Sequence, residues 1–167
     1  ALPNGINGWA DTYLVPKIAL GLNSTHMAYY SRTNNSAIVV EIGCADSFFC
    51  EMYIKLGTDM YALINDNTSG DAFTVADSLG LFVGNRNSSL NRTYWKKGVK
   101  LYTQVVASVD QPNLNAVLGS RNLSGVKAFF TNRECAYASL GPGLTDTNNT
   151  DLNNAVQTLE TTLSRQV

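Results

Sequence analysis

Charged residues and histidine are both scarce in this chain. Only 15% of the 167 residues are Asp, Glu, Lys or Arg, against roughly 25% in ordinary domains. The formal net charge is −1, so there is no basic field to attract a nucleic-acid backbone, and no nucleic-acid partner is expected. A single histidine, His26, and the absence of any Cys-x-x-Cys spacing exclude a zinc cage.

Long apolar runs and a leader sequence are also missing. No run approaches the ~20 residues of a membrane span. The chain does not open with a basic stretch followed by an apolar one, so neither a signal peptide nor membrane insertion is expected. The chain begins without Met. We therefore expect a cleaved product or a piece of a longer protein.

Cysteine is limited to Cys44, Cys50 and Cys135, an odd number that does not suit a disulfide scaffold. Two interpretations remain open. Cys44 and Cys50 lie six positions apart around an expected turn, a spacing that allows a disulfide across a hairpin. Alternatively, all three are reduced and half-buried thiols, because free cysteine is commonly buried.

Amides and hydroxyls replace the missing charge. The chain contains 46 Asn, Ser and Thr residues, and 44% of it is hydrophobic. That apolar content argues against disorder. The length suits a single domain spanning residues 1–167.

Most of the chain has a period-two pattern, as half-buried strands do. Gly and Asn turns separate the short stretches, and Lys97-Gly98 suits a tight hairpin. Many short strands at regular spacing predict an all-β sandwich or barrel. The run 14–20 contains Pro16 and is at best an edge strand. The other expected strands are 26–32, 37–42, 48–56, 60–64, 79–84, a hairpin within 93–106, 115–119 and 134–140.

The C-terminal segment changes to a helical period. Its apolar residues recur three and four positions apart, which predicts an amphipathic helix at about 146–164. Thr145 is the expected N-cap, with Thr150 as an alternative start. The helix should lay its apolar stripe on the sandwich and leave the polar face in water. The stripe is Leu152, Ala155, Val156, Leu159 and Leu163, and the polar face is Asn153, Asn154, Gln157 and Glu160.

Constellations typical of enzymes are not found. The acidic residues nearest to a glycosidase pair are Glu41, Asp46, Glu51 and Glu134, which do not alternate along one strand as such a pair would. Glu41 is expected to be a charge on the sheet surface, and His26, without a nucleophile motif, to be structural. Gly-x-Ser-x-Gly, P-loop and Gly-x-Gly-x-x-Gly motifs are absent. We therefore expect no enzymatic activity.

A calcium loop was tested in the segment 65–70, which imitates the start of an EF-hand loop. Ala76 occupies the twelfth position, where a bidentate Glu is required, so an EF-hand is rejected. Asp66 and Asp71 remain weak candidates for a loop calcium site. No other cofactor is expected.

Aromatic residues make up 10% of the chain, and three of them are candidates for ligand binding. Tyr94 and Trp95 are adjacent on an expected strand, with Tyr102 across the Lys97-Gly98 turn. Adjacent strand residues face opposite ways, so only one of Tyr94 and Trp95 should be in the core. The other could stack on a sugar ring or simply pair across the hairpin.

A weak internal repeat offers a second candidate. An apolar strand runs into Arg86-Asn87, and another runs into Arg121-Asn122. One interpretation is a row of Arg and Asn side chains at one rim of the sandwich, available to a ligand. The other is that strand ends need similar turn residues.

Several segments resemble the laminin-G-like, concanavalin-A-like jelly-roll domains of bacteriophage tail, fibre and other virion surface proteins. The resemblance implies a two-sheet antiparallel sandwich whose last strand leads into a helix, and it implies an adhesive or structural role without a catalytic motif. It also implies a further segment upstream of residue 1. The segments are Ala1–Gly5, Gly8–Thr12, Asn23–Asn34, Phe130–Asp146, Ala155–Leu159 and Ser164–Val167.

Three functions follow as hypotheses. The first is a virion surface module that binds host carbohydrate, as part of a tail fibre or a capsid decoration. The second is a structural virion domain that holds an oligomer, with other virion proteins or copies of itself as partners. The third is a polysaccharide-degrading enzyme, which lacks an evident carboxylate pair. The expected location is the surface of a bacteriophage particle.

Overall fold

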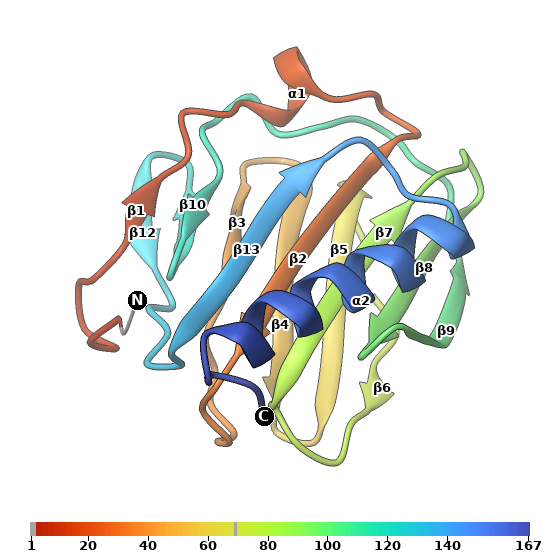
Figure 1. Cartoon of the computed structure of the whole chain (residues 1–167). Coiled ribbons are helices and arrows are strands. Elements are labelled where there is room, and N and C mark those ends of the chain that lie inside the picture. Colours follow the sequence, from red (N-terminus) through yellow and green to blue (C-terminus); the bar gives the residue numbers. More distant parts are fainter. Residues whose placement is uncertain (1–2, 69) are drawn as a thin grey trace.

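Two packed, mainly antiparallel β-sheets form the computed structural model, which describes residues 3–68 and 70–167 (Figure 1). Ala1 and Leu2, which open the first segment that carries the resemblance, lie outside the described residues, as does Ser69 in the expected turn 65–71. The architecture confirms the predicted two-sheet sandwich with a C-terminal helix.

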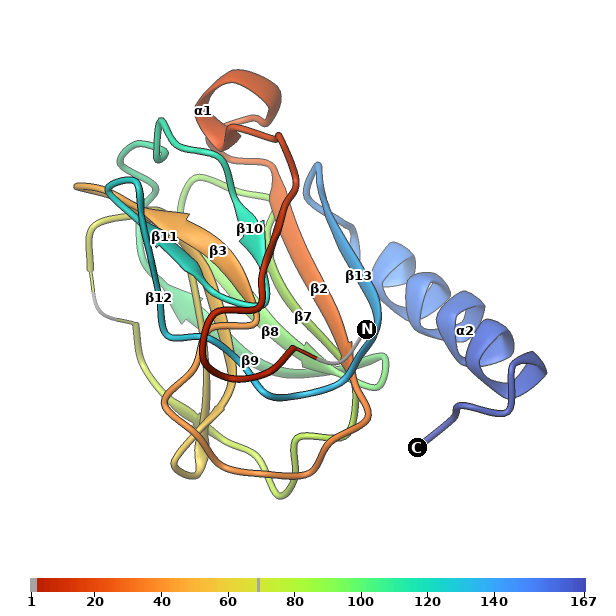
Figure 2. The ribbon, with the colours of Figure 1, turned by 90° about the vertical axis from the view of Figure 1, so that its left-hand side faces the viewer.

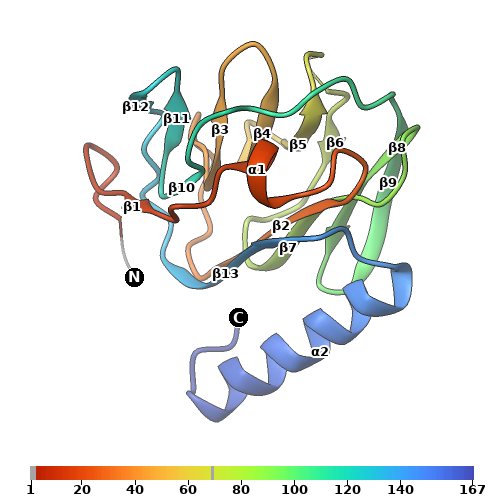
Figure 3. The same ribbon diagram turned by 90° about the horizontal axis from the view of Figure 1, so that it is seen from above.

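The larger sheet has eight strands and is called the open sheet below, because no helix of the described residues lies on its outer face (Figure 3). Six of its strands form one row. The other two strands form the β11–β12 hairpin, in which β11 pairs in parallel with β3 of the row. The row is β1 (Ala10–Asp11), β10 (Val117–Leu118), β3 (Ile42–Ala45), β4 (Phe49–Leu56), β5 (Asp59–Asp66) and β6 (Phe73–Thr74); the hairpin is β11 (Arg121–Leu123) and β12 (Val126–Ala128).

The smaller sheet has five strands and is called the covered sheet, because helix α2 (Asp146–Thr162) lies across its outer face (Figures 1 and 3). Its β8–β9 hairpin turns at Lys97 and Gly98 with φ of +49° and +77°, which confirms the predicted turn. The strand order is β13 (Cys135–Gly141), β2 (Thr25–Ser31), β7 (Gly80–Arg86), β8 (Asn91–Lys96) and β9 (Val99–Val105).

Two of the predicted strands were wrong. The run 14–20 contains a short helix, α1 (Pro16–Ala19), and Pro16 at its first position fits a helix start, where a missing N–H costs nothing. The stretch 37–42 contributes only Ile42 to β3, while Val40 makes an isolated bridge to Phe130. The remaining predicted strands all overlap observed ones.

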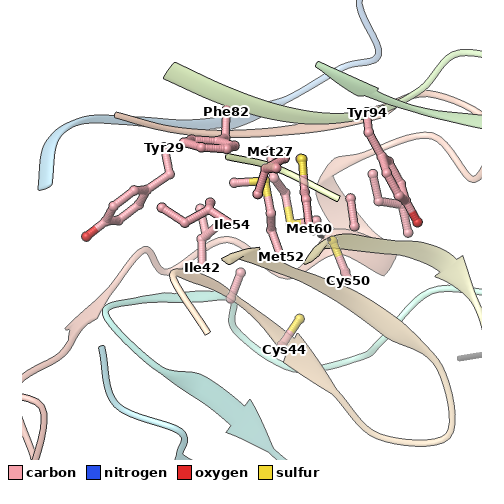
Figure 4. Close-up of a cluster of buried hydrophobic side chains, with 14 residues drawn as sticks. Met27, Tyr29, Ile42, Cys44, Cys50, Met52, Ile54, Met60, Phe82 and Tyr94 are labelled. Carbon is pink, nitrogen blue, oxygen red and sulfur yellow. Dashed lines mark hydrogen bonds between the residues drawn. The ribbon is translucent and has the colours of Figure 1, made fainter. Parts of the chain in front are cut away.

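The main core fills the space between the two sheets (Figure 4). Three methionines, Met27, Met52 and Met60, lie at its centre with zero exposure, and flexible thioethers fill irregular gaps well. Around them pack the fully buried side chains of Tyr29, Ile42, Ile54, Ile64, Phe82 and Tyr94.

Of the two interpretations of Cys44 and Cys50, the disulfide is not formed. The two residues face each other in register on β3 and β4, but both are free thiols. The Cys50 Sγ lies 3.8 Å from the Met27 Sδ, in the core. Burial raises the pKa of Cys50 to about 12, so the thiol stays protonated. Cys135 is partly buried, and its thiol donates to the Tyr137 carbonyl at 3.4 Å.

Helix α2 is capped as predicted, with the Thr145 side chain accepting a hydrogen bond from the Asn148 backbone N–H. Its burial pattern differs from the prediction. The buried residues are Asn149, Asn153, Val156 and Glu160, whereas Leu159 and Leu163 are 45% and 48% exposed. Three of the four buried helix residues are therefore polar, while Val156 and the partly buried Leu152 pack against apolar side chains of the covered sheet. Within the described residues, no helix is long and apolar enough to cross a membrane.

Candidate functional site

Among the described residues, a helix lies on the outer face of the covered sheet, and none lies on the outer face of the open sheet. Helix α2 packs on the covered sheet through a second apolar cluster that contains Tyr30, Val83, Trp95 and Val156. Figures 2 and 3 show the helix on that side, with the open sheet on the opposite side of the sandwich. A ligand that needs an exposed sheet surface therefore meets the open sheet.

Side chains of β4 and β5 line this outer face. Met52 and Ile54 point into the core, so the alternating residues Glu51 and Tyr53 point outward. Tyr61 on β5 stands in register with Tyr53. The two tyrosine rings meet edge to face, with centroids 6.2 Å apart and an interplanar angle of 74°. The strand alternation thus builds an aromatic pair beside a carboxylate.

Arg121 joins this group from the distant β11–β12 hairpin. Its Nη1 donates to Glu51 Oε1 at 3.1 Å, to Glu51 Oε2 at 3.2 Å and to the Tyr53 hydroxyl at 3.3 Å. The Tyr53 hydroxyl in turn donates to Glu51 Oε1 at 3.1 Å. Arg121 Nη2 makes no hydrogen bond with the residues that the structure describes. The Arg121 side chain is 14% exposed and that of Glu51 1%.

Phe129 completes the group. The guanidinium carbon of Arg121 lies 4.6 Å from the centre of the Phe129 ring, in cation–π range. Phe129 is 39% exposed, and its backbone has φ of +56°, a conformation that bulky side chains rarely adopt. A strained residue of this kind is a reason to suspect function. We refer to Glu51, Tyr53, Tyr61, Arg121 and Phe129 as the outer-face cluster.

Burial and neighbouring charges shift the pKa values of two groups in the cluster, Glu51 and Tyr53. Burial raises the pKa of Glu51, while the Arg121 guanidinium and the Tyr53 hydroxyl act in the opposite direction. Burial and the Glu51 carboxylate raise the pKa of Tyr53, so its hydroxyl remains a neutral donor. Arg121 is thereby held in place by one carboxylate and one hydroxyl, both bound through Nη1.

The cluster offers groups that are suited to recognising a ligand. A guanidinium can grip a carboxylate in two-pronged fashion, and aromatic rings offer apolar faces to sugar rings. The cluster contains a single carboxylate, whereas glycoside hydrolysis generally uses two. No group of three or more His, Cys, Asp or Glu in the described ranges is arranged to hold a metal ion.

The predicted aromatic site on β8 and β9 is not assembled. Tyr94 and Trp95 do face opposite ways, but both are buried, with exposures of 0% and 4%. Tyr94 lies in the main core, and Trp95 lies under α2, which makes the expectation of one exposed ring wrong. Tyr102 is partly buried, and its ring stacks on that of Phe73 with 5.9 Å between the ring centroids.

The predicted row of Arg and Asn side chains is not assembled either. Arg86 is fully buried, and Asn87 is exposed and donates to the Leu144 carbonyl. Asn122 is 4% exposed and bonds to the backbone of Asn115. Of the four residues, Arg121 is the one that lies in the outer-face cluster.

The weak calcium candidates are committed to other partners. Asp66 is completely buried, and its Oδ2 accepts from Arg86 Nη2 at 3.2 Å and from Arg92 Nη1 at 2.5 Å. Asp71 Oδ2 accepts from the Tyr102 hydroxyl at 3.1 Å. Two guanidinium groups against one carboxylate leave excess positive charge, which disfavours a divalent cation at Asp66.

Two further predictions, for Glu41 and His26, have different outcomes. Glu41 is fully buried rather than on the sheet surface, because it forms an ion pair with the equally buried Arg133. His26 is structural, as predicted: its Nδ1 lies 2.6 Å from the Pro142 carbonyl and its Nε2 3.0 Å from the Ser139 hydroxyl.

Most of the outer-face cluster escaped sequence reasoning. The sequence predicts Glu51 only as a member of a possible acidic pair, and it predicts no role for Tyr53, Tyr61 or Phe129. The available signal was the alternation along β4, which places Glu51 and Tyr53 on the face opposite Met52 and Ile54.

Known structures share this fold. A CBM40 of the IT-sialidase of Ruminococcus gnavus, bound to alpha2,3 sialyllactose, superposes with a TM-score of 0.64 at 13% identity, over 92% of this chain and 97% of that one. The K499G mutant of NanB sialidase from Streptococcus pneumoniae gives a TM-score of 0.60 at 14% identity, over 90% of this chain.

These neighbours confirm the concanavalin-A-like jelly-roll sandwich. The chain spans only 27% of the NanB sialidase chain. No family model matches the sequence, and neither does any curated protein.

Proposed function

We propose that this chain is a non-catalytic carbohydrate-binding domain whose binding site is the outer-face cluster of the open sheet. The observation that carries the proposal is Arg121, which is fixed by Glu51 and Tyr53 through Nη1 alone and flanked by the ring of Phe129. A preorganised guanidinium beside exposed aromatic edges suits a sugar that bears a carboxylate.

The proposed ligand class is a sialylated glycan. Sialic acid carries a carboxylate for Arg121, and its ring and side chain offer apolar surface to Tyr61 and Phe129. The CBM40 neighbour was solved with a sialylated trisaccharide, which supports this choice by analogy of fold. Glu51 serves as a positioning residue because its carboxylate is turned toward Arg121.

The proposed setting is the surface of a bacteriophage particle, in a tail fibre or a capsid decoration. The support is the resemblance of the terminal segments to virion surface domains, including Phe130–Asp146. In that setting the domain attaches the particle to glycans on its host. Partners in the particle would be other virion proteins or further copies of this chain.

Titration calorimetry with 3′-sialyllactose and with lactose tests the proposal. We expect binding of the sialylated sugar only, and loss of that binding in Arg121→Ala. Arg32→Ala is the matched control, because Arg32 also pairs with a glutamate, Glu134, at 2.9 Å, but lies outside the cluster. Equal binding of both sugars, or binding that survives Arg121→Ala, contradicts the proposal. Release of free sugar from the trisaccharide would instead support the hypothesis that the protein is a glycan-degrading enzyme.

A further inference from the structure

One edge of the covered sheet has no pairing strand among the described residues. Strand β13 pairs with β2 on one side, and no strand in residues 3–68 or 70–167 pairs with its other side. Its seven residues, Cys-Ala-Tyr-Ala-Ser-Leu-Gly, include neither a charge nor a proline, and six of them are partly exposed. Natural edge strands are normally blunted by Lys, Pro or a covering segment, because free N–H and C=O groups recruit further strands.

The opposite edge shows the usual protection. Strand β9, at the other end of the same sheet, carries Lys100 as its second residue, and the Lys100 Nζ lies 5.2 Å from the centre of the Trp95 ring. The two edge strands of the covered sheet therefore differ: β9 carries a charged residue and β13 carries none.

The open sheet extends past the free edge of β13. Strands β10 and β1 continue that sheet beyond β3, and Figure 1 shows them to the left of β13. Figure 2 looks onto this side of the sandwich. No strand of the described chain lies in the covered sheet opposite β1 and β10. An extended segment placed beside β13 would face them and close the sandwich.

Two cavities lie in that space. The larger, of about 270 Å³, is bounded by Trp9 and Ala10, by Leu118 of β10, and by Tyr29 and Cys135 of the covered sheet. The smaller, of about 210 Å³, is bounded by Leu14, Ile42, Leu118, Ala138 and Leu140. Both are lined largely by apolar side chains. Such cavities suit the alternate inward side chains of one added strand.

From these observations we propose that β13 is a strand-addition site for an extended segment of a partner polypeptide. The segment is uncharged where it pairs and carries apolar side chains at alternate positions. Backbone hydrogen bonds to β13 provide the affinity, and the two cavities select the inward side chains. The overhang of β1 and β10 favours a lone strand over the sheet edge of a second copy, because that copy would bring its own open sheet into the same space.

The test uses two synthetic peptides on the whole chain. One alternates valine or leucine with threonine between terminal lysines, and the other has the same composition with its apolar residues adjacent. We expect the first to bind at one site and to slow hydrogen exchange at β13 amides but not at β9. Trp9 is 44% exposed at the larger cavity and should shift its fluorescence to the blue, whereas Trp95 is already buried.

Matched variants locate the site. Ala138 faces the main core and the smaller cavity, so Ala138→Phe should fill the cavity and weaken peptide binding by about tenfold or more. Ala136, on the same strand, packs against the cluster under α2, so Ala136→Phe should leave binding within about twofold. If Ala138→Phe fails to fold, Ala10→Leu provides the same obstruction from β1 in the larger cavity.

Three results would overturn the inference. Equal binding of both peptides would remove the role of alternate side chains. Protection confined to β9 would place the site at the other edge. A chain that dimerises by itself with β13 amides protected would make a second copy the occupant. None of these outcomes bears on sialyllactose binding, because the outer-face cluster lies on the other side of the open sheet.

Discussion

The guanidinium of Arg121 stacks on the ring of Phe129, with 4.6 Å between the guanidinium carbon and the ring centre. Phe129 maintains this contact with φ of +56°. A left-handed conformation costs an L-residue roughly 1–2 kcal/mol, and glycine would avoid that cost. The ring is thus kept at a position where the backbone alone would favour glycine, which suggests that the ring matters for binding.

Replacing Phe129 by glycine should therefore separate stability from binding. We expect Phe129→Gly to remain within about 1 kcal/mol of the parent in urea unfolding, because relief of strain offsets the lost cation–π contact. Affinity for 3′-sialyllactose should fall by about fivefold to tenfold, since an aromatic contact of this kind contributes about 1 kcal/mol.

Ser124→Gly is the control for this substitution. Ser124 has φ of +48° in the turn of the same hairpin, so glycine relieves comparable strain without removing a ring from the cluster. Affinity should be unchanged in Ser124→Gly. Equal losses in both variants would mean that hairpin flexibility, rather than the Phe129 ring, controls binding.

Arg121→Lys tests whether the shape of the guanidinium matters in addition to its charge. Lysine keeps the charge but not the planar fork, so it can hold either Glu51 or a ligand carboxylate with less geometric definition. Affinity for the sialylated sugar should fall by about tenfold or more, while the unfolding midpoint changes little. Calorimetry and urea unfolding of the same preparation measure the two quantities, and full retention of affinity would reduce the role of Arg121 to that of a point charge.

Strand positions could be predicted from the sequence because alternate burial leaves a local period-two pattern. The pattern also oriented Tyr94 and Trp95 correctly toward opposite faces. Their joint burial could not be foreseen from it, because α2 covers the second face. In α2 the predicted apolar stripe is only partly right. Leu152 and Val156 pack on the sheet, but Leu159 and Leu163 are exposed. The polar residues Asn149, Asn153 and Glu160 are buried instead.

The outer-face cluster depends on contacts between distant parts of the chain. Arg121 is 70 residues from Glu51 along the sequence. The two meet because β11 pairs in parallel with β3 while β4 pairs with β3 on its other side. That register is set by tertiary packing and leaves no local periodic signal. Buried ion pairs such as Glu41–Arg133 escape prediction for the same reason.

Trp95→Ala should destabilise the fold without affecting glycan binding. Trp95 is 4% exposed under α2, and its indole N–H donates to the Thr93 hydroxyl at 2.9 Å. Truncating a buried tryptophan costs about 3–5 kcal/mol. Urea unfolding should show that loss, and calorimetry corrected for the folded fraction should give the parent affinity. A loss of affinity at unchanged stability would contradict this prediction and would indicate that Trp95 belongs to the binding site.

Asp66→Asn should be among the most destabilising single changes in the chain. The Asp66 carboxylate compensates Arg86 and Arg92, and all three side chains have zero exposure. Breaking a buried ion pair from one side costs about 3–5 kcal/mol, because the remaining charge is left uncompensated. Thermal unfolding with and without calcium provides the measurement. A parent protein whose melting temperature rises with calcium and falls with chelator would instead favour a metal at this carboxylate.

His26 should make stability depend on pH below neutrality. Desolvation lowers the pKa of His26 below its usual value of 6.5, although the bond to the Pro142 carbonyl acts in the opposite direction. The unfolded chain therefore takes up the proton first. The stability contribution is fully present above about pH 6.5 and is lost as pH falls toward the lower folded pKa, with a slope of at most roughly 1.4 kcal/mol per pH unit for one proton.

Comparison with His26→Asn isolates this effect. An asparagine amide can donate to the Pro142 carbonyl in place of Nδ1 but does not titrate. Glu41 and Glu51, whose pKa values burial raises, contribute with the opposite sign, so the parent slope alone is not diagnostic. The difference between parent and variant in free energy of unfolding should shrink from about pH 7.5 to about pH 5.5. A difference that stays constant or grows on acidification would mean that the folded protein accommodates the imidazolium.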